Sequence, residues 1–325
     1  KQTAHYVDCF TTVSDITATE CKELLEKPVD AVLPNGFEND FVPKGTTFTK
    51  KRKAARKRLL DVANALTGSD FNDDTLIVST SGRYEFRNKG IDVFIEAMNR
   101  LRFDENLKKE VVAFIEVPGW VNSPRQDLIE RLKSGESLDT PLDMPLLTHW
   151  LNEQEHDNVM NMAQSLGICN AKGDKVKLIF EPCYLTGDDG VLNMSYYDLV
   201  LGNDLCVYPS YYEPWGYTPL EAAAFGLPCI TTDLSGFGQW TTSTLQQATT
   251  LADGVMVLHR DDDNYGDLVE AISGTILRLA TTSAEDRKQA GRKAKALAAK
   301  AEWAHFIKYY FDAYQFALQK TAKKS

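Results

Sequence analysis

The sequence predicts an α/β fold in which helices cover both faces of a doubly wound, Rossmann-like parallel sheet. Apolar runs of strand length alternate with segments of helix length through most of the 325 residues. Runs that are apolar at nearly every position are typical of parallel strands buried on both faces. With 43% hydrophobic and 25% charged residues, the chain has the composition of a globular protein with a packed core.

The elements follow in order along the chain. Residues 9–14, 16–27 and 30–36 predict a strand, a helix and a strand, and an Asn-Gly pair predicts the turn that ends this unit. A basic amphipathic helix is expected at about 50–66. The remaining segments predict strands at 75–81, 110–118, 175–182, 204–210, 228–233 and 254–259, helices at 89–102, 196–203, 218–226 and most of 264–321, and a polar helical segment from 119 to about 172.

The formal net charge of −10 argues against general binding to nucleic acid or to an anionic membrane surface. One local exception is KKRKAARKRLL at 50–60, which is compatible with RNA binding or nuclear import. Its apolar residues recur at helical spacing, which favours a solvated helix face with the leucines turned inward. No apolar run approaches the length of a membrane span. We therefore expect neither a nucleic-acid nor a membrane partner.

Cysteine and histidine spacing predicts no metal site. The six cysteines are scattered without a C-x-x-C pair, which favours free thiols in a reducing cytoplasm. The five histidines share no spacing that is typical of metal ligands. Three adjacent acids at 261–263 follow the last predicted strand, where a metal-dependent transferase would place a D-x-D motif, but a solvated turn is the simpler interpretation.

The least ordinary stretch is SYYEPWGYTPLEAAAFGLPCITTDLSGFG at 210–238. Within it, Thr218, Pro219 and Glu221 fit a capping box at the start of a helix. The backbone N–H groups of residues 216–219 would then face an anion at the positive end of the helix dipole. Glu221 is either the partner of this cap or an acceptor of hydrogen bonds from a ligand's hydroxyl groups.

A second carboxylate, Glu213, precedes this helix on a bend that two prolines and a glycine keep irregular. The bend comes directly after the predicted strand 204–210, at the edge of the sheet where α/β proteins bind ligands. A carboxylate fixed there suits sugar hydroxyl groups, or positive charge that develops on a sugar ring. We therefore predict that Glu213 contacts a ligand.

A second loop, SGRYEFRNKG at 81–90, follows the predicted strand 75–81 and supplies Arg83 and Lys89. An arginine presents a planar fork to phosphate, and a lysine presents a point charge. Because the carboxyl ends of parallel strands share one edge of a sheet, these cations are the expected counter-charges of a pyrophosphate. Their alternative interpretation is as solvated loop residues.

These motifs closely resemble those of the animal and fungal type of glycogen synthase. That family has a two-domain GT-B fold and transfers glucose from UDP-glucose to the 4-hydroxyl of an α-1,4-glucan with retention of configuration. The resemblance runs from about residue 5 to 240, and more weakly through the helix that contains Trp303. Six motifs carry it: CFTTVSDITATE (9–20), LPNGF (33–37), GRYEFRNKG (82–90), VVAFIEVP (111–118), VKLIFEP (176–182) and the stretch from Pro209 to 238.

The resemblance implies a catalytic group of three residues. Arg83 and Lys89 would neutralise the pyrophosphate of the donor, and Glu213 would contact the glucose that is transferred. In families of this kind the phosphate of the leaving group helps to deprotonate the acceptor, so no separate general base is expected. The products would be UDP and the extended glucan, and no cofactor or metal is implied.

The resemblance also implies a set of donor-binding residues. Glu221 is similar to the second acid of an E-x₇-E pair, which would bind the ribose hydroxyl groups. Tyr196, in SYYDLVLGN, is similar to the aromatic residue that stacks on uracil. The backbone of Gly216, Tyr217 and Thr218 would meet the phosphates at the helix start.

By the same resemblance, residues 1–40 are the end of an N-terminal GT-B domain, and 41–302 form the nucleotide-sugar-binding domain with an insertion at 119–172. Residues 303–325 form a helix that crosses back toward the N-terminal domain. Because the active site of such an enzyme lies between two domains, the chain alone is expected to be inactive. Its expected partners are the missing domain, a nucleotide sugar, an α-glucan acceptor and, in a homo-oligomer, further copies of the chain.

Two other functions are compatible with the same residues. Glu213 and Glu221 could be the acid/base pair of a glycoside hydrolase, which requires carboxyl groups about 5–9.5 Å apart around a sugar. The basic loop and the helix start favour nucleotide binding instead. The chain could also be a non-catalytic module that binds a nucleotide or a glucan.

Overall fold

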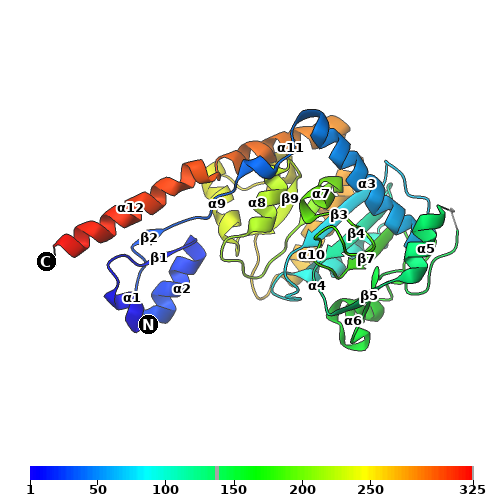
Figure 1. Cartoon of the computed structure of the whole chain (residues 1–325), viewed down its shortest axis with the longest axis horizontal. Coiled ribbons are helices and arrows are strands. Elements are labelled where there is room, and N and C mark those ends of the chain that lie inside the picture. Colours follow the sequence, from blue (N-terminus) through cyan, green and yellow to red (C-terminus); the bar gives the residue numbers. More distant parts are fainter. Residues whose placement is uncertain (136–138, 324–325) are drawn as a thin grey trace.

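The computed structural model describes residues 1–135 and 139–323, so that small parts of the segments 119–172 and 303–325 lie outside the described residues. Its centre is a six-stranded parallel sheet in the order β10-β9-β8-β3-β4-β7 (Figure 1). The strands are β3 (Leu76–Ser81), β4 (Val111–Glu116), β7 (Val176–Glu181), β8 (Leu205–Val207), β9 (Cys229–Thr232) and β10 (Val255–Leu258). All six were predicted, and the α/β fold with a parallel sheet is confirmed.

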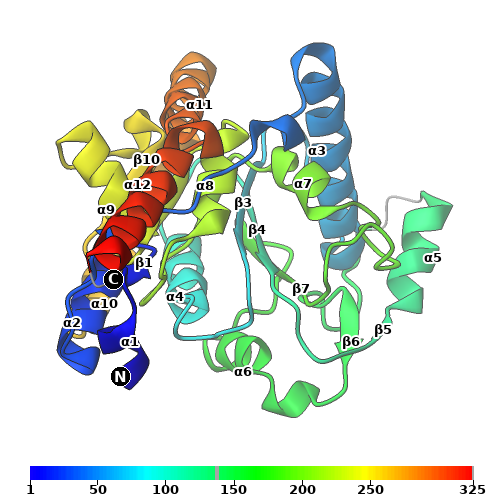
Figure 2. The same ribbon diagram turned by 60° about the vertical axis from the view of Figure 1, so that its left-hand side comes forward.

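Helices cover both faces of this sheet, because alternate residues of each strand point to opposite sides. In β4, Val111 and Ala113 pack in one hydrophobic cluster, whereas Val112 and Phe114 pack in another. The first face is covered by α4 (Ile91–Arg102), α6 (Asn158–Ser165) and α10 (Tyr265–Thr281). The second face is covered by α3 (Gly45–Thr67), α5 (Gln126–Ser134), α7 (Tyr196–Leu199), α8 (Tyr217–Ala224), α9 (Gly236–Leu245) and α11 (Ala284–Ala299) (Figure 2).

The basic helix α3 is a structural element with one buried face. Leu59 and Leu66 are fully buried against the sheet. Cations of the other face bind the segment that precedes β8. Arg52 donates to the carbonyl oxygen of Leu201 at 2.7 Å, and Arg56 donates to Asp204 at 2.8 Å. The leucines of KKRKAARKRLL are therefore turned inward as predicted, whereas the prediction of a solvated opposite face was wrong for Arg52 and Arg56, which bind carbonyl oxygens and Asp204.

The segment 119–172 is only partly helical, so the prediction of a helical segment was partly wrong. Besides α5 and α6 it contains an antiparallel pair, β5 (Val121–Pro124) and β6 (His149–Leu151). These strands have four and three residues, and an irregularity interrupts their register between Val121 and Ser123. Strands this short and irregular carry no detectable alternation of polar and apolar residues.

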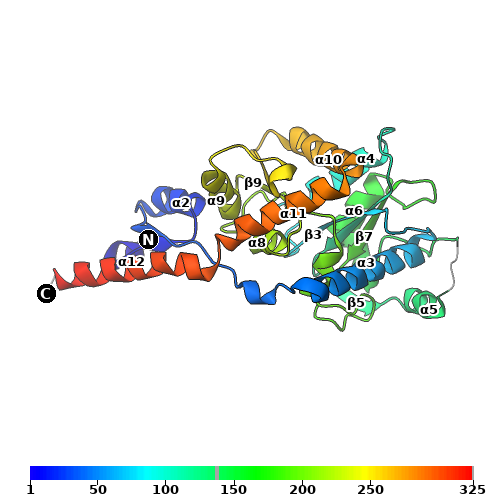
Figure 3. The same ribbon diagram turned by 90° about the horizontal axis from the view of Figure 1, so that it is seen from above.

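The N-terminal segment and the last helix lie together beside the sheet domain (Figures 1 and 3). The N-terminal segment contains α1 (Gln2–Tyr6), β1 (Thr11–Thr12), α2 (Asp15–Leu25) and β2 (Ala31–Val32), with β1 and β2 parallel. Helix α12 (Trp303–Ala322) packs on its end, where a Cβ atom at Gly36 would lie 2.7 Å from the Trp303 backbone. None of the helices in the described residues is long and apolar enough to cross a membrane.

The strand order places a topological switch between β3 and β8. From β3 the chain continues outward through β4 and β7, whereas from β8 it continues in the other direction through β9 and β10. In open parallel sheets, ligands bind at the carboxyl ends of the strands beside such a switch point. The loops that follow β3 and β8 are the two that the sequence singled out.

Candidate functional site

The two loops at the switch point are in direct contact. The backbone N–H of Tyr211 donates to the carbonyl oxygen of Asn88 at 2.7 Å. Gly90 has a positive φ of 69°, and a Cβ atom there would collide with the carbonyl oxygen of Pro209. A larger residue at position 90 would therefore separate the loops, so the glycine is what allows their close approach.

Lys89 and Glu213 form an ion pair between these loops. Their side chains are only 14% and 17% exposed, so water screens the pair weakly. The backbone of Glu213 is fixed on both sides, since its N–H donates to Leu234 O at 3.0 Å and its carbonyl accepts from Gly236 N at 3.0 Å. Two of the predicted catalytic residues thus meet at the predicted edge of the sheet.

Helix α8 begins two residues earlier than the capping box predicts, and this prediction was wrong. The N-cap is Gly216, with a φ of 112°, and Tyr217 is the first helical residue. A Cβ atom at Gly216 would lie 3.0 Å from Ser235 Oγ, so both the conformation and the space require glycine. Thr218 is therefore the second helical residue rather than the cap, while Gly216, Tyr217 and Thr218 still form the mouth of the helix.

Glu221 consequently lies in the second turn of α8 and is not a cap partner. Its Oε1 accepts a hydrogen bond of 2.9 Å from the Tyr197 hydroxyl. Burial raises the pKa of the Glu221 carboxyl, and the hydrogen bond from Tyr197 partly offsets this. The half-buried carboxylate keeps further acceptor positions, which is what a ligand with paired hydroxyl groups would use.

Tyr196 lies beside this carboxylate at the carboxyl end of β3. Its hydroxyl lies 3.1 Å from Ser81 Oγ, in the last residue of the strand. Burial, followed by the charge of Glu221, raises the pKa of Tyr196 well above the ordinary range. Tyr217, at the start of α8, is 44% exposed, and its pKa is raised by burial and then by Glu221. The predicted donor-binding side chains thus surround one carboxylate.

Arg83 lies in the exposed part of the first loop. Its side chain is 72% exposed, and its ion pair is with Glu85 of the same loop at 3.1 Å. A role for Arg83 beside a phosphate stays a prediction, because the contacts of its guanidinium are within its own loop.

Sequence reasoning missed several residues that hold the site. Ser235 caps α9 through the N–H of Gly238 at 3.2 Å and donates to Trp215 O at 3.1 Å. The Tyr212 hydroxyl donates to Glu20, which ties the loop of Glu213 to the N-terminal segment. Such partners lie far apart in the chain, and only the Ser-Gly-Phe-Gly run hinted at a helix cap.

The three adjacent acids form a turn, as predicted. Asp261 Oδ1 accepts from the backbone N–H groups of Asp263 and Asn264, both at 2.9 Å. His259 donates toward the same residue, with 3.1 Å between Nε2 and Asp261 Oδ2. The carboxylate therefore has local partners that account for its position.

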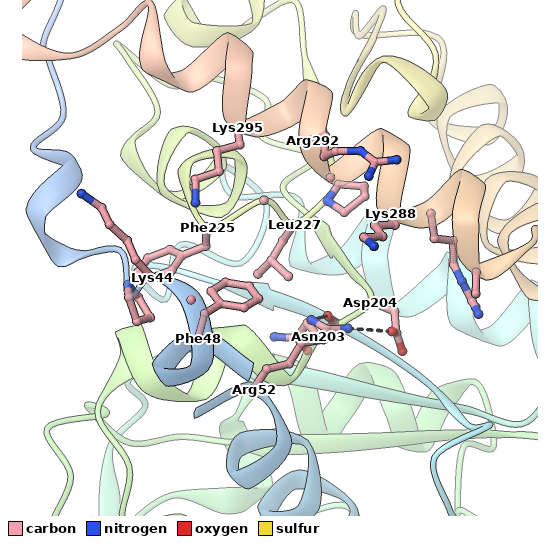
Figure 4. A pocket seen from close by; sticks show the side chains of 17 residues that line it. Lys44, Phe48, Arg52, Asn203, Asp204, Phe225, Leu227, Lys288, Arg292 and Lys295 are labelled. Atoms are coloured by element: carbon pink, nitrogen blue, oxygen red, sulfur yellow. Dashed lines mark hydrogen bonds and ion pairs between the residues drawn. The ribbon is translucent and has the colours of Figure 1, made fainter. Parts of the chain in front are cut away.

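A separate cavity of about 580 Å³ lies at the opposite edge of the sheet. Asn203 and Asp204, which directly precede β8, line it together with α3 and α11 (Figure 4). Its cationic lining includes Arg52, but this guanidinium is already bound to Asp204 at 3.2 Å. Because this edge carries the amino ends of the strands, the cavity is not part of the candidate site.

Two solved structures are similar in fold. Sucrose-phosphate synthase from Thermosynechococcus elongatus has a TM-score of 0.54 and 17% identity, covering 94% of this chain and 57% of that one. WaaG, a glycosyltransferase involved in lipopolysaccharide biosynthesis, has a TM-score of 0.55 and 17% identity, covering 93% of this chain and 61% of that one. These similarities agree with the predicted GT-B architecture.

Sequence comparisons identify the family. The chain is 31% identical to glycogen [starch] synthase of Neurospora crassa, 29% to isoform 2 of Saccharomyces cerevisiae and 28% to the liver protein of Mus musculus. Each match covers 98% of this chain, whereas the chain spans only about half the length of these relatives (52%, 54% and 53%). Residues 1–137 and 137–324 match the family model described as glycogen synthase. The chain therefore belongs to the glycogen synthase family, as its motifs predicted.

Proposed function

We propose that the chain carries the donor-binding half of a retaining glucosyltransferase, which transfers glucose from UDP-glucose to the non-reducing end of an α-1,4-glucan. The observation that carries the proposal is the Lys89–Glu213 pair, held next to the Gly216 mouth of α8 at the topological switch point. Membership of the glycogen synthase family supports glucose transfer as the reaction. The choice of uracil over adenine in the donor rests on the same membership.

We propose a role for each charged group. Lys89 and the N–H groups at the mouth of α8 would neutralise the diphosphate, and Arg83 would add charge from the exposed loop. Glu213 would face the sugar, where its carboxylate stabilises the positive charge that develops as the bond from C1 to the phosphate oxygen breaks. The electrons of that bond go to the phosphate, which accepts the proton of the acceptor hydroxyl as the new glycosidic bond forms.

Glu221 and Tyr196 would position the nucleoside. The Tyr197 hydroxyl holds one oxygen of Glu221 at 2.9 Å, and the carboxylate would accept hydrogen bonds from the ribose hydroxyl groups. Tyr196 would contribute its ring to the base, while Ser81 holds its hydroxyl. We propose that this arrangement holds the nucleoside of a nucleotide sugar and that the reaction uses no cofactor.

The acceptor surface and the rest of the active site belong to the proposed missing domain. The contact between Tyr212 and Glu20 shows where the N-terminal segment touches the loop of Glu213. We propose that the isolated chain binds the donor but does not transfer glucose, and that it can assemble as a homo-oligomer. The six free cysteines favour a cytoplasmic location.

Calorimetric titration with UDP tests this proposal. We expect Lys89→Ala and Arg83→Ala each to weaken UDP binding, because each removes a charge-assisted contact worth about 1.5–3 kcal/mol, or about 10- to 150-fold in affinity. Arg87→Ala is the matched control, since Arg87 is an 85% exposed arginine of the same loop that pairs with Asp92. Equal UDP affinity in all four proteins would refute the site.

Two further measurements separate the alternatives. Hydrolysis of a nitrophenyl glucoside in the absence of UDP would favour a hydrolase that uses Glu213 and Glu221. Incorporation of glucose into glycogen after the N-terminal domain is added would favour the transferase over a binding module. Tighter binding of ADP than of UDP in the calorimetric titration would overturn the assignment of uracil as the base.

A further inference from the structure

Three potential metal ligands meet at the carboxyl end of β7, away from the Lys89–Glu213 pair. One ligand atom from each of His149, Glu181 and Cys183 can be chosen so that all three lie within 4.8 Å of one another. Glu181 is fully buried, His149 is 1% exposed, and Cys183 is half-buried. The cluster is thus a closed group of imidazole, carboxylate and thiol, with the thiol on its more accessible side.

Strand pairing brings these residues together across more than thirty positions of sequence. The backbone of residues 146–148 runs along the edge of β7, where Phe180 N donates to Leu146 O at 2.6 Å and Thr148 N donates to Phe180 O at 3.2 Å. This pairing carries the next residue, His149, to the end of β7, where Glu181 is the last residue and Cys183 follows after a proline.

The hydrogen bond of His149 to a backbone carbonyl fixes which ring nitrogen carries the proton. Nε2 lies 2.8 Å from the carbonyl oxygen of Asp189, which can only accept, so Nε2 carries the proton. In the neutral ring with this tautomer, Nδ1 is unprotonated. Nδ1 faces Glu181. Histidines that bind a metal through one nitrogen commonly donate the other ring N–H to a backbone carbonyl, as Nε2 does here.

The carboxyl group of Glu181 has polar neighbours in His149, Thr148 and Cys183. Neither of its oxygens has a well-aligned hydrogen bond among the described residues, although the Thr148 hydroxyl and the Cys183 thiol lie close enough to affect its pKa. Glu116, the register neighbour of Glu181 on β4, is also buried and has no hydrogen-bond partner among the residues that the structure describes. Buried carboxylates of this kind are expected to be paired or to coordinate a cation.

One separation in the cluster matches that of two ligands of a tetrahedral ion. His149 Nδ1 lies 3.4 Å from Glu181 Oε1. Two ligands at about 2.0–2.1 Å from a tetrahedral zinc ion are about 3.3 Å apart, so these two atoms already have the required separation. The Thr148 hydroxyl, now 2.9 Å from Nδ1, has an alternative acceptor in Phe180 O at 3.3 Å, so it can release that nitrogen.

We propose that His149, Glu181 and Cys183 bind one divalent cation, with Zn²⁺ as the best match to a nitrogen, oxygen and sulfur donor set. Imidazole and thiolate together favour zinc over magnesium or calcium, which take oxygen ligands. The half-exposed side of Cys183 leaves the fourth position for water. Binding displaces the thiol proton and joins the edge segment at 146–149 to β7, so the ion stabilises the fold at this end of the sheet.

Metal titration of the purified chain tests the proposal. After treatment with a chelator, we expect one Zn²⁺ per chain in calorimetry and a higher unfolding temperature with Zn²⁺ than without it. Replacement by Co²⁺ should give a thiolate-to-cobalt charge-transfer absorption. Cys183→Ser should abolish this absorption and weaken Zn²⁺ binding at least about tenfold, whereas Cys169→Ser, which removes an exposed cysteine outside the cluster, should change neither.

The absorption spectrum of the wild-type Co²⁺ complex tests the metal site even if Cys183→Ser fails to fold. A cobalt complex without thiolate absorption, or no binding of Zn²⁺ or Co²⁺, would overturn the proposal, as would absorption that persists in a folded Cys183→Ser variant. UDP titration of the same preparations reports on the Lys89–Glu213 site separately, so failure of one proposal leaves the other measurable.

Discussion

Replacement of Lys89 by methionine tests whether the Lys89–Glu213 pair is sequestered from water. The change keeps the length of the side chain but leaves Glu213, which is 17% exposed, without its cation. Removing one partner of a fully buried pair costs about 3–5 kcal/mol, and exposed pairs contribute about 0.2–1 kcal/mol. Since both side chains are mostly buried, we expect Lys89→Met to lower the free energy of unfolding by about 2–3 kcal/mol.

A double-mutant cycle isolates the interaction. Glu213→Gln removes the charge in nearly the same shape, so we expect the double variant to lose about 1–2 kcal/mol less than the sum of the single variants. Urea unfolding followed by both tryptophan fluorescence and far-UV circular dichroism gives the four values. Lys57→Met is the control, because Lys57 and its partner Asp61 are 72% and 39% exposed, and a loss below about 0.5 kcal/mol is expected.

The outcome that refutes this reasoning is specific. If Lys89→Met costs no more than Lys57→Met, and the losses of the cycle are additive within about 0.3 kcal/mol, the pair is solvated and the loops are not closed as described. Restoration of most of the lost stability in the double variant would instead show that an unpaired Glu213 carboxylate, and not lost packing, causes the loss.

Two further predictions concern the same site. Burial raises the pKa of Glu221, so UDP binding that needs its carboxylate should weaken as the pH falls, starting at a pH above the pKa of an ordinary glutamate. Tyr197→Phe removes a hydrogen bond to the ionised carboxylate. In this variant the loss of UDP affinity should therefore begin at a higher pH than in the wild type. Identical pH profiles of UDP affinity for the wild type and Tyr197→Phe would contradict this role of Tyr197. Gly216→Ala should lower the unfolding free energy by about 1–3 kcal/mol and weaken UDP binding, because its φ is 112° and its Cβ would lie 3.0 Å from Ser235 Oγ. Gly167→Ala, at a φ of 65° in open space, should cost less in the same unfolding assay and leave UDP binding unchanged.

The sheet could be predicted because its signals are local. Each of β3, β4 and β7 is a run of six buried residues, and such a run is visible without knowing its neighbours. The antiparallel pair β5 and β6 was missed because its pairing depends on a segment about 25 residues away and its strands are too short to show a pattern. The start of α8 was misplaced for a similar reason: Thr218 and Glu221 fit a capping box, but the space beside Ser235 selects Gly216 as the cap.

The candidate site shows how far a local pattern can determine chemistry. The proximity of Lys89 and Glu213 could be predicted from the sequence, because both residues follow strands and the carboxyl ends of parallel strands lie at one edge of the sheet. His149 could not be joined to Glu181 in this way, since it follows a stretch whose pairing with the edge of β7 is set by tertiary packing. A search for metal ligands based on sequence spacing therefore does not detect this spatial group, whose ligand atoms lie within 4.8 Å of one another. Topology transmits the position of loops that follow strands, whereas an edge contact such as that of residues 146–148 must be observed.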